Sequence, residues 1–382
     1  MNAGNTLPAG KPEKTEVRVG YLPLTDCAAV IVAAELGFDQ RYGIRILPAR
    51  AGSWAAVRDG LLTGELDAAH ALYGLMYGVH LGLGGMQRDM AVLMTLNQNG
   101  QGITLAAQLA AEGVKSGDDL ARRIRRDARR FTFAQTFPTG THAMWLYYWL
   151  AALGIHPLRD VKSIVVPPPL MVAALRAGQM DGYCAGEPWH SLGAAEGVGF
   201  TIASSGDIWP DHPEKVLGAT ADWAAANPGT ASALIAALLD ASRFVDDVRN
   251  REQVAALLEE KGGLPLPAAV LNAGLSGTCV AGGLKCFDDG RVNYPYLSDG
   301  MWFLTQYRRW GLLPQEPDYL ALARSINHVA LYQQGAALAG VPLPASSMRS
   351  SRLMDGVVWD GRDPAGYAAG FAVQGAAAVA RQ

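Results

Sequence analysis

The segment best suited to bind a charged ligand is a helix start that carries a histidine. Residues 137–154 read FPTGTHAMWLYYWLAALG, so a turn places His142 in the first turn of a helix. The residues behind it have the spacing of a core-facing stripe: Trp145, Tyr148, Trp149 and Ala152. Free backbone N–H groups and the positive end of the helix dipole make such a start attractive to anions. His142 is therefore a candidate anion ligand.

Four further polar or aromatic positions lie at predicted strand-to-helix turns. Trp54 begins a helix, Gln101 follows an Asn-Gly turn, Gly186 ends a strand, and Lys215 follows a proline. Taken alone, Trp54 and His142 are more often structural than ligand-binding. In open α/β sheets, however, ligands lie outside the carboxyl ends of the strands, where all five residues can converge. They would form a donor-rich, acceptor-poor set, which suits a small oxyanion.

The bulk composition excludes several classes of protein. The 382 residues are half hydrophobic, and 32 Lys+Arg against 35 Asp+Glu give a net charge of −3. Such a chain has no general attraction for nucleic acid or an anionic membrane. It contains no run long enough to span a membrane and no signal peptide, so we expect a cytoplasmic protein. The four cysteines form no C-x-x-C pair, and we expect neither metal nor cofactor.

The order of predicted elements indicates an α/β fold with two lobes. Strands and helices alternate from residue 16 onward, which favours mostly parallel sheets. Residues 61–74 and 175–188 share the pattern L-x-x-G-x-[LM]-D-[AG], consistent with two lobes of similar construction. We expect a disordered lead over 1–15, lobe I over 16–105 and 211–345, lobe II over 106–210, and an Ala/Gly-rich tail over 346–382.

Common enzyme signatures are absent from the sequence. There is no G-x-S-x-G, no G-x-x-x-x-G-K-[ST] and no H-E-x-x-H motif. A dinucleotide fingerprint beginning at Gly82 fails because position 87 is Gln. We therefore expect a protein that binds its ligand without catalysis.

Four segments in order resemble one known family. NGQGITL, FPTGTHAMWLYYWLAALGIHP, IVVPPPLMVAALRAGQMDGYCAGEPW and HPEKVLG closely resemble the nitrate/bicarbonate-binding proteins of ABC transporters, the NrtA/CmpA group. The resemblance covers roughly residues 16 to 320. It implies a type II periplasmic-binding-protein fold, in which two α/β lobes close on a ligand.

The resemblance also implies a ligand pocket. The matching positions are Gln101 in NGQ, His142 in GTH, Gly186 in AGEPW, Lys215 in HPEK and Trp54 in GSW. Bicarbonate-binding relatives carry an acidic residue at the position of Lys215, whereas an ammonium suits nitrate or nitrite. We expect Lys215 to be the main source of charge selectivity. We expect His142 to be a donor, with affinity rising as the pH falls if the anion favours the charged ring.

The resemblance extends to cytoplasmic sensors of the NasS type. In that group the sensor holds an RNA-binding ANTAR antiterminator, NasT, until nitrate or nitrite binds, and then releases it to allow expression of nitrate-assimilation genes. We adopt this as the main functional hypothesis. The alternatives are a nitrate-binding component of an ABC transporter, an enzyme related to thiamine-pyrimidine synthases, and an α/β protein without a small ligand.

Overall fold

Two five-stranded sheets form the two lobes of the chain. The computed structural model describes residues 10–277 and 283–375. Lobe I has the strand order β2-β1-β3-β10-β4 and lobe II the order β7-β6-β8-β5-β9. The lobe I strands are β1 (Glu16–Tyr21), β2 (Arg45–Arg50), β3 (Ala68–Leu72), β4 (Met90–Thr95) and β10 (Lys215–Thr220). The lobe II strands are β5 (Gln101–Ala106), β6 (Thr132–Gln135), β7 (Lys162–Val165), β8 (Gly182–Gly186) and β9 (Gly199–Ser204).

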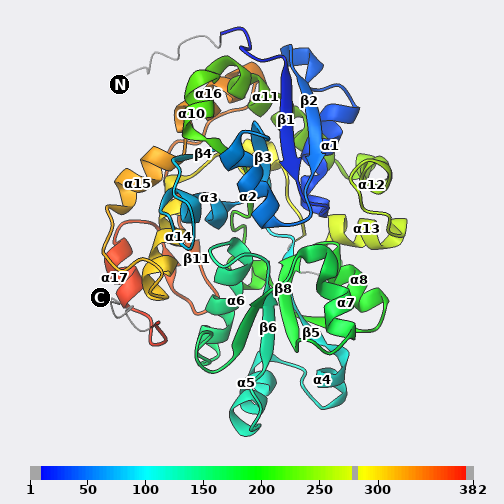
Figure 1. The fold of residues 1–382 in the computed structure, drawn as a ribbon, viewed down its shortest axis with the longest axis vertical. Helices are drawn as coiled ribbons and strands as arrows, with labels where there is room; N and C mark the ends of the chain where they lie inside the picture. The colour runs from blue at the N-terminus through cyan, green and yellow to red at the C-terminus, as the bar shows by residue number, and fades with distance from the viewer. Residues whose placement is uncertain (1–9, 278–282, 376–382) are drawn as a thin grey trace.

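The two sheets have equivalent topologies. In each, three neighbouring strands run parallel, and the fourth strand, β10 or β5, is antiparallel to both of its neighbours. Figure 1 shows the lobes one above the other along the long axis, with β1 to β4 in the upper lobe and β5 to β8 in the lower one. The expected two-lobed α/β architecture is confirmed.

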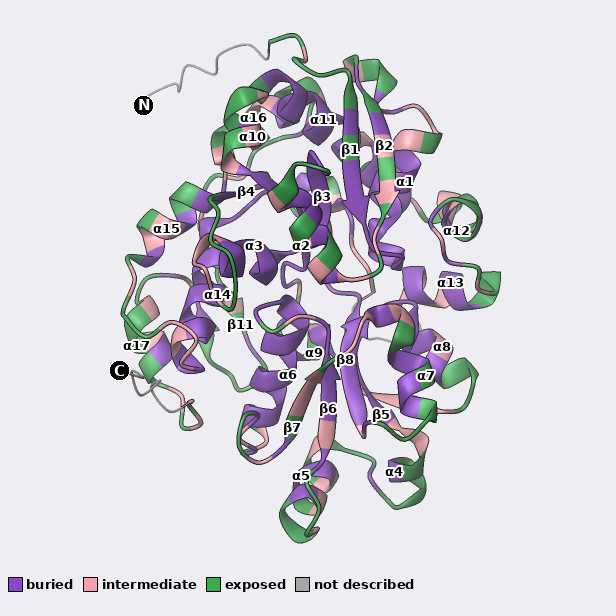
Figure 2. Cartoon of the chain, viewed as in Figure 1, coloured by how far each residue is buried: buried purple, intermediate pink, exposed green. Residues whose placement is uncertain are grey.

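Helices cover the sheets and fill the side of the molecule near the C-terminus. Beside the lobe I sheet lie α1 (Ala28–Glu35), α2 (Trp54–Thr63), α3 (Tyr73–His80), α10 (Ala221–Ala226), α11 (Pro228–Asp246), α12 (Arg251–Glu260), α13 (Ala268–Ser276) and α16 (Val329–Leu338). Lobe II carries α4 (Ala107–Ala111), α5 (Gly117–Arg126), α6 (Thr141–Ala152), α7 (Met171–Arg176), α8 (Trp189–Ala195) and α9 (Ser205–Ile208). The remaining helices are α14 (Leu297–Arg309), α15 (Tyr319–Ile326) and α17 (Pro364–Ala369). Figure 2 shows that the strands β3 and β4 and the helix α3 are buried.

The internal sequence echo corresponds to one repeated structural unit. In each lobe a helix, α2 or α7, is followed by a glycine with positive φ, Gly64 (75°) or Gly178 (67°), and then by the central strand. The shared aspartate caps the neighbouring strand. Asp67 accepts a β1 backbone N–H at 2.9 Å, and Asp181 accepts a β6 backbone N–H at 2.8 Å. The shared sequence pattern therefore corresponds to the glycine turn and the aspartate contact that precede each central strand.

The boundary between the lobes differs slightly from the expected one. We expected lobe I to continue to residue 105, but β5 pairs with β8 and β9 in the lobe II sheet. The first crossing between lobes thus lies at residues 96–100, before Gln101. Val, Leu, Ile and Thr occur in both β4 and β5 or in one of them, so a β-forming sequence lies on either side of the crossing and composition alone does not locate it.

Both ends of the chain contain more structure than composition suggested. Residues 10–15 were expected to be disordered, but the Glu13 carboxylate accepts backbone N–H groups of Gly229 at 3.1 Å and Thr230 at 2.8 Å. In the expected Ala/Gly-rich tail, the strands β11 (Ser351–Arg352) and β12 (Val358–Trp359) pair, and α17 follows. The buried Trp359 indole anchors this segment by donating to Ser298 O at 2.9 Å. The rest of the lead and tail, 1–9 and 376–382, lies outside the described residues.

The lobes approach closely at a pair of glycines on α3. Gly74 and Gly78 face Thr139, in the turn that precedes α6. A Cβ atom at Gly78 would lie 2.7 Å from the Cβ of Thr139, which is too close for two carbon atoms. Tyr307 joins the same elements, because its hydroxyl lies 2.6 Å from Gly74 O and 2.8 Å from Thr139 O. This contact sets how near the start of α6 comes to lobe I.

Candidate functional site

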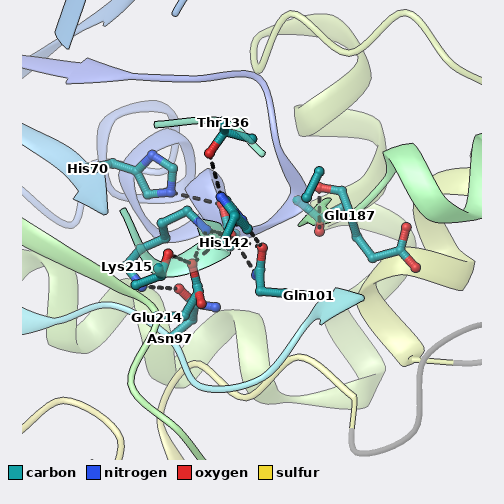
Figure 3. Close-up of polar contacts among 12 residues, drawn as sticks. His70, Asn97, Gln101, Thr136, His142, Glu187, Glu214 and Lys215 are labelled. Atoms are coloured by element: carbon teal, nitrogen blue, oxygen red, sulfur yellow. Dashed lines mark hydrogen bonds and ion pairs between the residues drawn. The ribbon is translucent and has the colours of Figure 1, made fainter. Parts of the chain in front are cut away.

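The five predicted site residues meet where the two lobes face each other. Gln101 begins β5, His142 lies in the first turn of α6, and Gly186 ends β8, all in lobe II. Lys215 is the first residue of β10 in lobe I. Gln101 and Lys215 thus open strands and do not lie at strand-to-helix turns as predicted. Trp54, Gln101, His142 and Lys215 are no more than 1% exposed. Figure 3 shows Gln101, His142 and Lys215 pointing toward one another.

Gly186 and Trp54 border this cluster. A Cβ atom at Gly186 would lie 2.5 Å from the side-chain oxygen of Gln101, so only glycine lets β8 pass so close. The Lys215 ammonium lies 5.7 Å from the centre of the Trp54 ring, at cation–π distance. Ser53 positions Trp54 by capping α2, where its hydroxyl accepts the backbone N–H of Ala56 at 3.1 Å.

His142 is held as a neutral hydrogen-bond donor. Its Nε2 lies 2.7 Å from Gln101 Oε1, and its Nδ1 lies 2.6 Å from the Thr136 hydroxyl. Because an amide oxygen only accepts, Nε2 carries the proton and the Thr136 hydroxyl donates to Nδ1. The Gln101 amide nitrogen faces two acceptors, Asp26 Oδ2 and Asn99 O, each at 3.2 Å, which supports this orientation of the amide.

His142 is uncharged, whereas the pH-dependent affinity considered above requires a ring that becomes charged near pH 6.5. Burial, and then the positive charge of Lys215, hold the pKa of His142 well below its usual value. The ring therefore stays neutral over the ordinary pH range and has one N–H to donate. The direction of this pKa shift argues against His142 as the source of a rise in anion affinity near pH 6.5.

Lys215 is a charged donor whose three N–H groups face three acceptors. Its Nζ lies 2.7 Å from Asp26 Oδ2, 3.1 Å from Glu214 Oε1 and 3.4 Å from Gln101 Oε1. Burial alone would lower the pKa of Lys215, but the two carboxylates outweigh it and raise the pKa. The predicted cation is therefore present and charged, and it is already paired.

Asp26 and His70 form a second polar pair beside Lys215. Asp26 follows β1, and its Oδ1 lies 2.8 Å from Nε2 of His70 on β3. Although burial opposes it, Lys215 and His70 hold the pKa of Asp26 far below its usual range. Burial lowers the pKa of His70, although Asp26 opposes this, so His70 Nε2–H donates to an ionised carboxylate.

Two buried polar atoms next to this pair lack a hydrogen-bond partner among the described residues. They are His70 Nδ1 and Trp54 Nε1, and the two rings lie 5.5 Å apart. Buried polar atoms are rarely left unpaired. The Trp54 indole N–H is thus a buried donor without a hydrogen-bond partner among the described residues.

Glu214 occupies the anion-attracting start of α6. Its carboxylate accepts the Thr141 hydroxyl, the Trp145 indole N–H at 2.6 Å and the Lys215 ammonium at 3.1 Å. Thr141 and Trp145 both belong to α6, so a side chain of lobe I binds at the helix start of lobe II. The expectation of an acceptor-poor site is therefore wrong, because Asp26 and Glu214 both lie within it.

Four residues of the site were missed by sequence reasoning: Asp26, His70, Thr136 and Glu214. Asp26 and Thr136 follow strands, so the rule that placed the other residues applied to them too. His70 is a lone polar residue in an apolar strand, and Glu214 lies inside the HPEK motif. Among the described residues, no group of His, Cys, Asp and Glu has an arrangement that could hold a metal ion.

A buried polar site between two α/β lobes of equivalent topology defines the class of two-lobed ligand-binding proteins. Residues 10–259 match the model of the NMT1-like family. The chain belongs to this family and, within it, to the NrtA/CmpA group, which confirms the family inferred from the motifs.

Several named proteins are similar to this chain over most of its length. The nitrate/nitrite binding protein NrtA of Synechocystis sp. is 35% identical over an alignment of 382 positions, which covers 93% of this chain and 84% of that protein. The crystal structure of the periplasmic nitrate-binding protein NrtA from Synechocystis superimposes with a TM-score of 0.90 at 33% identity, covering 95% of this chain and 100% of the other. The bicarbonate transport ATP-binding protein CmpC of Synechococcus elongatus is 35% identical over 93% of this chain and 54% of its own length. The type II periplasmic-binding-protein fold is confirmed.

Proposed function

We propose that the chain is a nitrate/nitrite-binding protein and that it serves as the substrate-binding component of an importer. The observation that carries the proposal is the charged Lys215 ammonium at the lobe interface, beside the neutral donor His142 and the unpartnered Trp54 indole. An anion removed from water needs both a countercharge and neutral donors, and these residues supply them. The names of the NrtA relatives support nitrate and nitrite as the ligands.

Binding requires the hydrogen bonds of the site to be exchanged. Lys215 now donates to Asp26, Glu214 and Gln101, so an incoming anion must take over at least one of these bonds. Because the contributing residues come from both lobes, an anion that bridges Lys215 and His142 would favour the closed arrangement. A ligand shifts such an equilibrium only through its stronger binding to one state.

Calorimetric titration of the full chain with nitrate, nitrite, bicarbonate and chloride tests this proposal. We expect nitrate or nitrite to bind with a Kd of about 1 μM or tighter, equivalent to about −8 kcal/mol. We expect bicarbonate and chloride to bind at least a hundredfold more weakly. Binding of bicarbonate alone would contradict the assignment, since we expect the Lys215 ammonium to favour nitrate or nitrite.

The sensor hypothesis remains a prediction at this same anion site. It requires the chain to hold an ANTAR antiterminator and to release it when nitrate or nitrite binds. The named relatives are transporter proteins, which favours the importer role. A pull-down of the chain with an ANTAR protein encoded beside it, with and without nitrate, separates the two roles.

A cytoplasmic location is the prediction that goes with the sensor hypothesis, and cell fractionation tests it. Among the helices of residues 10–277 and 283–375, none is long and apolar enough to cross a membrane. We propose binding without catalysis, since the relatives' names describe binding and transport. Recovery of unchanged nitrate after incubation with the protein would agree with this proposal.

A further inference from the structure

The buried site already contains two carboxylates and one ammonium, so its charges do not balance when another anion is added. Asp26 and Glu214 are each no more than 1% exposed. Among the residues the structure describes, Lys215 is the one Lys or Arg that forms an ion pair with either carboxylate. A bound oxyanion would be a third negative group competing for that cation. Unpaired charges in a buried site are costly, so one negative charge must be neutralised on binding.

The contacts indicate which carboxylate is neutralised. Besides Lys215, Asp26 has two neutral donors, His70 Nε2–H and the Gln101 amide. Glu214 has only Lys215 as a charged donor, and its other donors are the neutral hydroxyl of Thr141 and the neutral indole of Trp145. Each carboxylate thus has one cation and two neutral donors, but the Lys215 ammonium lies nearer to Asp26, at 2.7 Å, than to Glu214, at 3.1 Å. A ligand that takes over one of these bonds would therefore displace the more distant Glu214 and leave it as the buried carboxylate with no cation.

We propose that nitrate or nitrite binds to this site together with a proton, which Glu214 takes up as the anion displaces it from Lys215. This inference rests on the proposed function. The anion forms its hydrogen bonds with the Lys215 ammonium, the Lys215–Glu214 ion pair breaks, and a proton from solvent bonds to the Glu214 carboxylate. The protonated Glu214 then has an O–H to donate, so an acceptor of the site becomes a donor.

The groups around Glu214 do not offer another place for this proton. His142 Nε2 and His212 Nδ1 each lie 3.6 Å from the carboxylate, and burial lowers the pKa of both rings. Burial raises the pKa of Glu214 itself, against the effect of Lys215. The titratable or charged groups around Glu214 are His142 on α6, His212 before β10, Lys215 on β10 and Cys184 on β8. Asp26 acts on Glu214 indirectly, through its charge on Lys215, and Arg349 does so through its charge on His212.

Proton uptake gives the affinity a defined pH dependence. Since binding consumes a proton, acid favours the complex. The association constant should fall by up to about tenfold per pH unit wherever Glu214 is ionised in the free protein and protonated in the complex. The effect belongs to the protein, because nitrate remains an anion throughout the range.

Calorimetry with potassium nitrate in two buffers of different ionisation enthalpy counts the protons directly. We expect the full chain to take up about one proton per nitrate at neutral pH, and Glu214→Gln to take up close to none. Glu187→Gln is the matched control. Glu187 is also a buried glutamate, with a pKa raised by burial to about 7, but its carboxylate bonds to Ser191 and not to Lys215. This control should retain the uptake.

The other possible results either overturn this inference or contradict the proposed function. Nitrate binding by the unaltered chain without proton uptake would overturn this inference, as would uptake that persists in Glu214→Gln or disappears in Glu187→Gln. If Glu214→Gln does not fold, the nitrate affinity of the unaltered chain between pH 6 and 9 decides, and a flat profile overturns the inference. Absence of any nitrate or nitrite binding would instead contradict the proposed function.

Discussion

The indole of Trp145 on α6 donates to the carboxylate of Glu214, with 2.6 Å between Nε1 and Oε2. Trp145 belongs to lobe II, whereas Glu214 directly precedes β10 of lobe I. Both side chains are fully buried. This hydrogen bond therefore fastens the two lobes together at the anion site, and it links lobe closure to the charge state of Glu214.

Replacement of Trp145 by Phe should weaken anion binding without removing any direct anion contact. In the proposed complex Glu214 is protonated, and a hydrogen bond between neutral groups contributes about 0.5–1.5 kcal/mol, so Trp145→Phe should raise the Kd for nitrate by about twofold to tenfold. Trp209→Phe is the matched control, because Trp209 lies in the same aromatic cluster and its Nε1 has no hydrogen-bond partner among the described residues. Equal affinities for both variants would show that the Trp145–Glu214 bond does not contribute to closure.

Lys215 should stabilise the fold as well as bind the anion. Lys215→Met leaves Asp26 and Glu214 buried without a cation, and breaking a buried ion pair costs about 3–5 kcal/mol. The double variant Lys215→Met/Asp26→Asn should recover part of this loss, since one uncompensated charge is removed. Urea unfolding measures both effects. The single variant should also lose nitrate binding, and retention of full stability in it would refute the pairing described here.

Asp26 should make the stability of the chain sensitive to acid. The pKa of Asp26 is lower in the folded chain than in an unfolded chain, where a carboxyl titrates at about 3.9. Its contribution is present above that pH and is lost as the pH falls toward the folded pKa. The free energies of unfolding of the unaltered chain and Asp26→Asn should differ at pH 7 and converge below about pH 4. Parallel curves would mean that Asp26 does not carry this stability.

How much the sequence predicted depended on the kind of signal. The first turn of α6, the start of α2 at Trp54 and the end of β8 were all predicted, because turn and cap residues act locally. The neutral state of His142 was not predicted, because it depends on Thr136, Gln101 and burial, which only the assembled lobes bring together. The same holds for Glu214, whose partners Thr141 and Trp145 lie in the other lobe.

The glycines of α3 should be required for the lobes to approach each other. In Gly78→Ala the new methyl group would lie 2.7 Å from the Cβ of Thr139, so the turn before α6 must move away. We expect weaker nitrate binding and a larger radius of gyration in X-ray solution scattering. Gly85→Ala serves as the control, because a Cβ atom there would meet only Arg58 Nη1, at 4.0 Å. Unchanged affinity in Gly78→Ala would show that this contact does not limit closure.

A crystal structure of the full chain grown with nitrate would show whether the anion takes the place of Glu214 at Lys215. We expect a planar anion between the lobes, within hydrogen-bond distance of Lys215 Nζ and His142 Nε2 and beside the Trp54 indole. We also expect the Lys215–Glu214 pair, now at 3.1 Å, to have separated. Nitrate bound elsewhere, or a Lys215 that keeps all three of its present acceptors with nitrate in the crystal, would contradict this binding mode.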